Sequence, residues 1–267
     1  MELLHIVVLA LIQGLTEFLP VSSSAHLILP SQVLGWPDQG LAFDVAVHVG
    51  TLSAVVLYFR RDLTAMSRAW FGQFAGRPAT ADTRLGWAVI LGTIPAGLAG
   101  LLLNDFVEAE FRSIAVIATT TILFGLLLGW ADRFKGHQRE LSQMTWKDVL
   151  VIGLSQAIAL IPGTSRSGIT MTMALFMGLS RDASARFSFL LSIPLILAAG
   201  GLKTLELVEQ GAEAVWSPLI LGALIAGGSA YLCIHFFLKF LQKISFMPFV
   251  IYRIVLGLGL FALVGLG

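Results

Sequence analysis

The sequence contains a single cysteine, Cys233, among its 267 residues. One thiol excludes an intramolecular disulfide and any metal cluster held by several thiolates. Cys233 lies in an apolar stretch, so we expect it to act only as a small packing residue. Neither disulfide nor thiolate chemistry can therefore explain the fold or the function.

Charged residues are also scarce. They make up 12% of the chain, whereas hydrophobic residues make up 57%, and the mean hydropathy is +0.86. This composition lies far outside the range of soluble globular proteins and predicts an all-α integral membrane protein. The net charge of +1 says little about partners by itself. We expect membrane lipids as partners and no nucleic acid.

The N-terminal segment lacks the basic residues of a cleavable signal peptide. It begins MELLHIVVLA, with an acid and no Lys or Arg before the apolar stretch. We therefore expect it to belong to the mature fold, with residues 1–267 forming a single membrane domain.

Six stretches are long and apolar enough to cross a hydrocarbon core of roughly 30 Å. Two further apolar segments, 2–34 and 149–179, are interrupted by LPVSSSA at 19–25 and by IPGTSRSG at 161–168. Backbone that is broken at membrane depth must be buried in protein or line a wet cavity, so we predict two re-entrant helix pairs. The six predicted spans are 41–59, 87–104, 114–130, 186–203, 217–238 and 247–266.

The distribution of basic residues predicts the orientation. If both broken segments return to the side from which they start, thirteen basic residues in four loops share one face, which the positive-inside rule makes cytoplasmic. The other face then receives only Arg112 and Lys203, with several acids, and both termini are periplasmic. The thirteen are Arg60, Arg61, Arg68, Arg77, Arg84, Arg133, Lys135, Arg139, Lys147, Arg181, Arg186, Lys239 and Lys243.

The two halves of the chain, about 1–131 and 149–267, resemble each other. LPVSSSA matches IPGTSRS, and FDVAVHVGTLSAVV matches FSFLLSIPLILAAG. Each half is a broken hairpin followed by three spans, and an odd number of crossings inverts the second half. Inverted repeats with broken helices place a site near the membrane interior, where the repeats meet.

The first broken segment carries unusual polar chemistry. Gln13 and Glu17 are four residues apart and share a helix face, and a carboxylate in a membrane segment is a functional candidate by default. Three serines stand where a second helix would begin, where capping hydroxyls and free N–H groups form an anion site. His26 follows and can act as base or nucleophile. The three serines are Ser22, Ser23 and Ser24.

The second broken segment supplies positive charge. In PGTSRSG, Gly163 permits close backbone approach and Arg166 offers a fork suited to phosphate oxygens. An ion pair between Arg166 and Glu17 is compatible with that role. Acid, hydroxyls, imidazole and guanidinium together suit phosphoryl transfer. The segment's hydroxyl groups belong to Thr164, Ser165 and Ser167.

Three other polar residues lie in predicted spans outside the two broken segments. His48 and Asp44 share a helix face and are able to support the site, but the pattern favours helix packing. Arg253, in the last span, is expected to extend its guanidinium to the cytoplasmic interface near KISFMP.

Two motifs resemble the undecaprenyl-diphosphate phosphatase family, the bacterial membrane enzymes associated with bacitracin resistance. QGLTEFLPVSSSAH at 13–26 is similar to the family's (E/Q)xxxE signature region, and PGTSRSGIT at 162–170, which ends at Thr170, is similar to PGxSRSxxT. The resemblance covers essentially the whole chain. It implies hydrolysis of undecaprenyl diphosphate to the monophosphate, which recycles the lipid carrier for cell-wall glycans in the bacterial plasma membrane.

The resemblance also implies an inverted-repeat fold, a site open to the periplasm and dependence on a divalent cation, Mg²⁺ or Ca²⁺. Glu17 would bind metal or handle protons, Arg166 would hold phosphate, and Ser23 and His26 would be nucleophile candidates. Gln13 stands where many members have a second glutamate, which weakens any mechanism that needs two carboxylates. Substrate contacts are expected from Ser22, Ser24, Gly163, Thr164, Ser165, Ser167 and Thr170, and from Gln13, which could also assist the metal.

The nucleophile is Ser23, His26 or an activated water, and we favour Ser23 assisted by His26. The main alternative function is a transporter or flippase for a phosphorylated prenyl lipid, because inverted repeats with broken helices are common in transporters. A channel or passive scaffold would leave Glu17, His26 and Arg166 unexplained. A homodimer is compatible with the sequence, which does not fix the oligomeric state.

Overall fold

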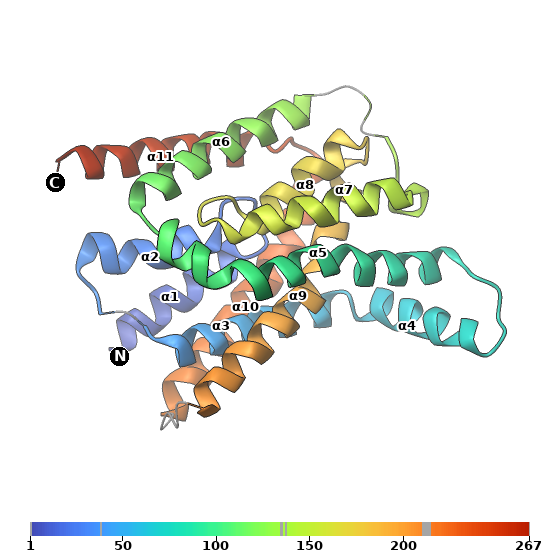
Figure 1. Ribbon diagram of the computed structural model, residues 1–267, viewed down its shortest axis with the longest axis horizontal. Coiled ribbons are helices and arrows are strands. Elements are labelled where there is room, and N and C mark those ends of the chain that lie inside the picture. Colours follow the sequence, from blue (N-terminus) through green and yellow to red (C-terminus); the bar gives the residue numbers. More distant parts are fainter. Residues whose placement is uncertain (1, 38, 134–135, 137, 210–214, 267) are drawn as a thin grey trace.

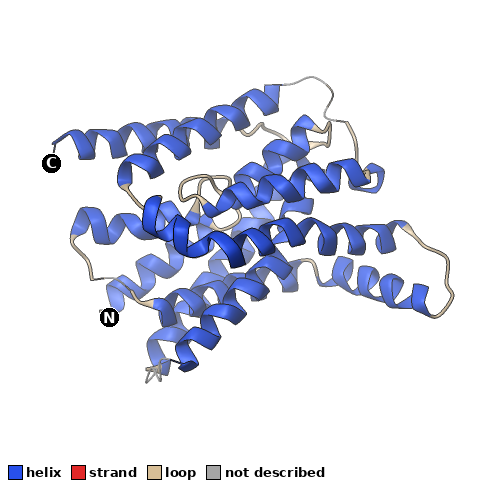
Figure 2. Ribbon diagram, in the orientation of Figure 1, coloured by secondary structure: helices blue, strands red, loops and turns tan. Residues whose placement is uncertain are grey.

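The computed structural model describes residues 2–37, 39–133, 136, 138–209 and 215–266. These residues form eleven α-helices joined by short loops, and the described part of the chain contains no strand (Figures 1 and 2). The helices are α1 (Leu3–Thr16), α2 (Ser23–Leu34), α3 (Leu41–Tyr58), α4 (Arg60–Phe74), α5 (Ala81–Glu110), α6 (Ile114–Arg133), α7 (Trp146–Ala157), α8 (Arg166–Phe176), α9 (Arg181–Glu209), α10 (Trp216–Leu241) and α11 (Met247–Leu266).

All six predicted spans are confirmed as helices. Six helices of the described chain are long and apolar enough to cross a membrane, and these are α3, α5, α6, α9, α10 and α11. Their outer surfaces carry large exposed apolar side chains such as Leu102, Leu224 and Val255, as expected for a surface that faces lipid. The two predicted broken segments are the pairs α1–α2 and α7–α8.

One helix was not predicted. Residues 60–84 were expected to form a charged loop, but α4 occupies residues 60–74 of it. Arg60, Arg61 and Arg68 interrupt any long apolar stretch, so a search for spans overlooks this helix. An apolar stripe nevertheless packs α4 against α5, where the ring centroid of Trp70 lies 5.4 Å from that of Trp87.

Helix packing depends on close backbone approach between small residues. α10 packs against α1 and α3, whereas α5 packs against α7 and α9. A Cβ added to Gly153 on α7 would lie 2.7 Å from the carbonyl oxygen of Gly92 on α5. A Cβ added to Gly227 on α10 would lie 3.0 Å from the carbonyl oxygen of Gly50 on α3. Such contacts are typical of helices that associate within membranes.

The chain ends and the basic loops lie at opposite ends of the molecule. In Figure 1 the start of α1 and the end of α11 lie on the left, whereas α4 and the start of α7 lie on the right. Of the charged residues used to predict orientation, Lys135 lies outside the described residues. Which end faces the periplasm remains a prediction.

Candidate active site

The two broken segments have the same backbone geometry at their tips. Ser22 precedes α2 with φ 72°, Ser165 precedes α8 with φ 71°, and these are the only non-glycine residues with positive φ in the described chain. The Ser22 and Ser24 hydroxyl oxygens lie 3.2 Å apart, and so do those of Ser165 and Ser167. Two matching pairs at strained positions indicate that the tips are built alike.

The carboxylate of Glu17 joins the two tips. Its Oε2 accepts hydrogen bonds from Ser23 Oγ at 2.8 Å and Gln13 Nε2 at 3.0 Å. Its Oε1 pairs with Arg166 Nη2 at 3.1 Å. Ser23 and Arg166 are the first residues of α2 and α8, so the acid contacts the start of both helices. Ser167 Oγ adds a hydrogen bond of 2.7 Å to the Leu19 carbonyl.

The predicted position of Arg253 is wrong. This residue is fully buried, and its guanidinium donates to five backbone carbonyls, four of them within 3.2 Å, instead of reaching the interface. The fixed, forked geometry of five N–H donors allows one side chain to satisfy carbonyls from several segments. The four nearest acceptors are Thr121 on α6 at 3.0 Å, Pro20 in the first tip at 3.2 Å, and Gly163 and Thr164 in the second tip at 2.8 and 3.0 Å.

Several predicted substrate contacts of the second tip are buried against protein. A Cβ at Gly163, whose φ is +86°, would lie 2.6 Å from the Ile117 carbonyl oxygen. Thr170 Oγ1 lies 2.8 Å from Ser188 Oγ, and Thr164 Oγ1 is buried without a hydrogen-bond partner among the described residues. With Ser165 and Ser167, these residues shape the tip and hold it to its neighbours.

The imidazole of His26 bonds groups other than the Ser23 hydroxyl. Its Nδ1 is 2.7 Å from the Ser22 carbonyl oxygen, which can only accept, so Nδ1 carries the hydrogen. Its Nε2 therefore accepts the hydroxyl hydrogen of Tyr252. Both ring nitrogens are occupied, and this geometry gives no support to a role for His26 in assisting Ser23.

Two cavities lie beside Glu17. A polar cavity of about 420 Å³ is lined by Ser23, Ser24, Leu27, Ile28, Ser31, Gln39, Asp44, His48 and Arg112. A neighbouring cavity of about 330 Å³ is lined by Glu17, Leu41, Asp44, Val45, His48, Arg166, Leu195, Ile196, Ala199, Gly200 and Lys203. Asp44 and His48 belong to both linings, so helix packing alone does not describe them.

Two isolated basic residues mark these cavities in the sequence. Arg112 and Lys203 are the only basic residues that the charge distribution assigns to the outer face, and each lines one cavity. Isolated basic residues on an otherwise acidic face are the expected feature of a site for an anion.

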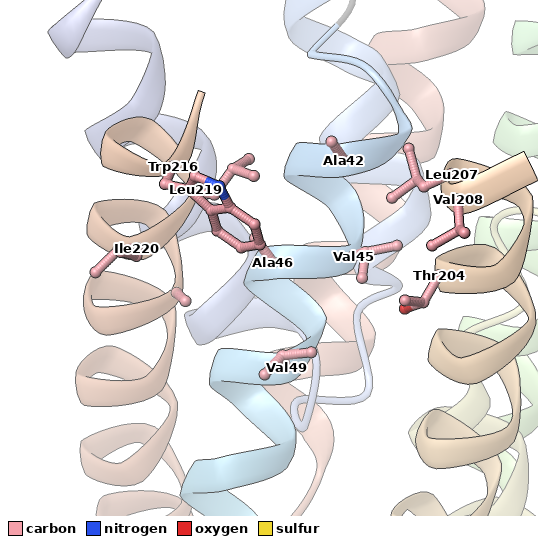
Figure 3. Close-up of a pocket in the computed structure, with 11 residues that line it drawn as sticks. Ala42, Val45, Ala46, Val49, Thr204, Leu207, Val208, Trp216, Leu219 and Ile220 are labelled. Atoms are coloured by element: carbon pink, nitrogen blue, oxygen red, sulfur yellow. The ribbon is translucent and has the colours of Figure 1, made fainter. Parts of the chain in front are cut away.

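An apolar groove, whose lining residues are drawn in Figure 3, adjoins the second cavity at Val45. It has a volume of about 420 Å³ and lies between α3, α9 and α10. Val45 lines both the groove and the cavity that holds Glu17 and Arg166. The groove is lined by Ala42, Val45, Ala46, Val49, Thr204, Leu207, Val208, Trp216, Leu219, Ile220 and Ala223.

The donor set for a divalent cation is small. Among the described residues no group of three or more His, Cys, Asp or Glu side chains could hold a metal ion. Gln13 Oε1 is buried without a hydrogen-bond partner in the described chain, and oxygen atoms are the ligands that Mg²⁺ and Ca²⁺ prefer. This oxygen and Glu17 fit a cation whose remaining ligands come from phosphate and water.

Known proteins resemble the chain over nearly its whole length. Residues 6–259 match the family described as bacitracin resistance protein BacA. A protein of Hahella chejuensis named undecaprenyl-diphosphatase is 66% identical over 97% of both chains. Proteins of the same name from Chromohalobacter salexigens and Saccharophagus degradans are 60% identical over 97% and 58% identical over 99% of both chains. This chain is a multi-pass membrane protein that belongs to the bacitracin resistance protein BacA family.

Proposed function

We propose that this protein hydrolyses undecaprenyl diphosphate to undecaprenyl phosphate and inorganic phosphate. The family, and the name that close relatives carry over nearly the full chain, support this proposal. The observation that carries it is the position of Glu17, which bonds Arg166 within one cavity and Ser23 on the wall of the other. A hydroxyl, an acid and a guanidinium at one point form a minimal apparatus for phosphoryl transfer.

We propose that the fold is an inverted repeat, in which α1–α2 and α7–α8 are re-entrant. α1 contains 14 residues, and at about 1.5 Å per residue it is roughly 21 Å long, too short for a core of roughly 30 Å. The matching geometry of Ser22 and Ser165 supports the repeat. So does the packing, because α10 contacts α1 and α3 as α5 contacts α7 and α9.

We propose that the site opens to the periplasm of a bacterial plasma membrane and that both termini face the same side. The start of α1 and the end of α11 lie at the end of the molecule opposite α4 (Figure 1). The basic residues of α4 favour the cytoplasmic side for that end.

The diphosphate would occupy the polar cavity and the prenyl tail the apolar groove. Arg166 and Arg112 supply positive charge to the cavities. The N-terminus of α2 adds backbone N–H donors, since no side chain caps it. The groove that begins at Val45 gives the tail a path between α3 and α9.

The hydroxyl of Ser23 is the nucleophile in this proposal. As Ser23 Oγ forms its bond to the terminal phosphorus, its proton passes along the existing hydrogen bond to Glu17. The anhydride bond breaks, and its electron pair stays on the lipid monophosphate. Arg166 neutralises the phosphate oxygens during this step. His26, held by Ser22 and Tyr252, positions the start of α2.

A divalent cation would be held by Glu17 and the free oxygen of Gln13, with most ligands supplied by the diphosphate and water. When bound, it would neutralise the charge of the diphosphate. Addition of EDTA should therefore suppress phosphate release, and Mg²⁺ or Ca²⁺ should restore it.

The proposal is tested with purified protein in detergent and a long-chain prenyl diphosphate labelled in the terminal phosphate. We expect cation-dependent release of phosphate and an acid-stable, base-labile labelled adduct that disappears in Ser23→Ala. An acid-labile adduct would assign the attack to histidine, and no adduct would assign it to water. A protein that releases no phosphate but moves labelled lipid between leaflets of vesicles would be a transporter.

A further inference from the structure

His48 faces both cavities of the site, yet none of the roles proposed above uses it. It lines the polar cavity together with Ser23 and the neighbouring cavity together with Glu17 and Arg166. Its side chain is half-buried in the third helix, α3. It is near enough to Glu17 for the charges of the two groups to interact.

Hydrogen bonding fixes which ring nitrogen of His48 carries a hydrogen. Nδ1 lies 2.7 Å from the Asp44 carbonyl oxygen, which can only accept, so Nδ1 is the donor. Nε2 of the neutral ring then has a free lone pair. Among the described residues this nitrogen has no hydrogen-bond partner, and it is not sealed off from the cavities. Neutral His48 therefore offers a base to a molecule in the site.

The other groups that could accept a proton are already occupied. Nε2 of His26 accepts the hydroxyl hydrogen of Tyr252. Glu17 accepts hydrogen bonds from Gln13, Ser23 and Arg166, and it takes the Ser23 proton in the first step. Gln13 is an amide and cannot act as a base. Asp44 also lines both cavities, and its Oδ1 already accepts a hydrogen bond from Gln39 at 3.0 Å. Nε2 of His48 is therefore an acceptor open to a water molecule in the cavities.

We propose that His48 is the general base that activates the water molecule which releases phosphate from the site. This inference rests on the proposed function. Nε2 takes a proton from water while the water oxygen forms its bond to the phosphorus held on Ser23. The P–O bond to Ser23 breaks, its electron pair stays on Oγ, and Glu17 returns the proton to that oxygen. The imidazolium then gives its proton to the departing phosphate.

The cavities are lined by both acidic and basic groups, and both kinds suit a general base at His48. Acids favour the imidazolium that forms when water loses its proton, whereas basic groups favour the anionic phosphate. A histidine base must be neutral to act, so the rate of phosphate release should fall on the acidic side of the pH profile. The charged groups that line the cavities with His48 are Glu17, Asp44, Arg112, Arg166 and Lys203.

The test replaces His48 by glutamine, which has an N–H donor for the Asp44 carbonyl but no base. We expect His48→Gln to lower kcat for phosphate release by about 10²-fold or more, the usual range for a lost general base, with KM changed less than threefold. The labelled adduct on Ser23 should accumulate above the wild-type level. This accumulation also demonstrates that the variant is folded and completes the first step.

A second variant, His48→Ala, should regain activity when imidazole is added, which a purely structural role of His48 would not allow. The matched control is His235→Gln, an exposed histidine on α10, which should retain wild-type activity and pH dependence. If His48→Gln stays within threefold of wild type with the same acidic limb, or loses activity without accumulating the adduct, His48 is not the base. If wild type itself releases no phosphate, the proposed function fails instead.

Discussion

At the residue scale, Glu17 determines how the two tips of the site combine. Its side chain is 8% exposed, and an unpaired carboxylate at such a position would be costly. Two of its three hydrogen-bond donors, Ser23 and Arg166, come from helices that begin 143 residues apart. In the proposed mechanism the acid therefore orients both the nucleophile and the phosphate-binding group.

Removal of the Arg166 guanidinium should abolish most of the turnover. Arg166→Ala takes away the positive charge beside Glu17, and we expect kcat/KM for phosphate release to fall by at least about 10²-fold. Arg166→Lys keeps the charge but loses the fork, so it should recover only part of the activity. The matched control is Arg186→Ala on α9, whose partner Asp182 lies on the same helix. Activity of Arg166→Ala within tenfold of wild type would contradict the proposed function.

Arg253 acts on stability rather than on substrate. Replacement by methionine keeps the length of the side chain but removes every hydrogen bond from Arg253 to these backbone carbonyls, and each buried carbonyl left without a donor costs about 1–3 kcal/mol. We expect Arg253→Met to lower the Tm in detergent by many degrees and Arg253→Lys, with three donors, by less. Thermal unfolding of the purified variants measures the effect. The exposed Lys243→Met should leave the Tm unchanged, and an equal Tm for Arg253→Met would contradict this role.

At the element scale, the start of α7 is held by a capping arrangement with an ion pair. Asp148 is 1% exposed; its Oδ2 accepts from Arg139 Nη2 at 2.6 Å and from the Thr145 backbone N–H at 2.7 Å. Burial alone would raise the pKa of the Asp148 carboxyl, but hydrogen bonds from Arg139 and Thr145 outweigh burial and hold that pKa below its usual range.

This lowered pKa predicts how stability depends on pH. The contribution of Asp148 is fully present above the unfolded pKa of about 4 and is lost as the pH falls through the lower, folded pKa. Asp148→Asn should reduce the free energy of unfolding by about 1–3 kcal/mol at pH 7, and the difference from wild type should shrink below pH 4. Unfolding followed by tryptophan fluorescence across this range provides the measurement. If the difference in unfolding free energy between wild type and Asp148→Asn stays constant with pH, the pKa of Asp148 is not lowered in the folded protein.

The spanning helices and the breaks in the two broken segments could be predicted from the sequence, whereas most contacts between distant side chains could not. The six spans and the breaks at Pro20 and Pro162 follow from hydropathy and from proline, which act locally. The prediction for Arg253 failed for a different reason. An arginine in an apolar helix can extend to the interface or donate to buried carbonyls, and which of the two occurs depends on where other segments of the chain lie. The sequence favours helix packing for His48 for the same reason, since the role proposed for it depends on cavities whose walls come partly from α2, α8 and α9.

At the scale of the whole molecule, the polar cavity, the cavity at Glu17 and the apolar groove adjoin one another through shared lining residues. His48 connects the first two and Val45 the last two. Lipid is as apolar as the groove, so the groove contributes position and selectivity for the tail rather than hydrophobic affinity. Blocking it should therefore discriminate between substrates by the length of the tail.

Ala46→Trp on α3 would fill the groove beyond Val45 without touching Glu17 or Arg166. A long prenyl tail must then leave its path, and we expect kcat/KM for the long-chain diphosphate to fall about tenfold, equivalent to about 1.4 kcal/mol. The five-carbon tail of dimethylallyl diphosphate occupies far less of the groove, so its kcat/KM should fall much less, within twofold of wild type. Leu224→Trp, on the lipid-facing surface of α10 outside the groove, controls for the added indole. No loss for the long-chain substrate would mean that the tail leaves the site by another route. Equal losses for both substrates would mean that the substitution disturbs the site itself, because only an obstruction of the path distinguishes a long tail from a short one.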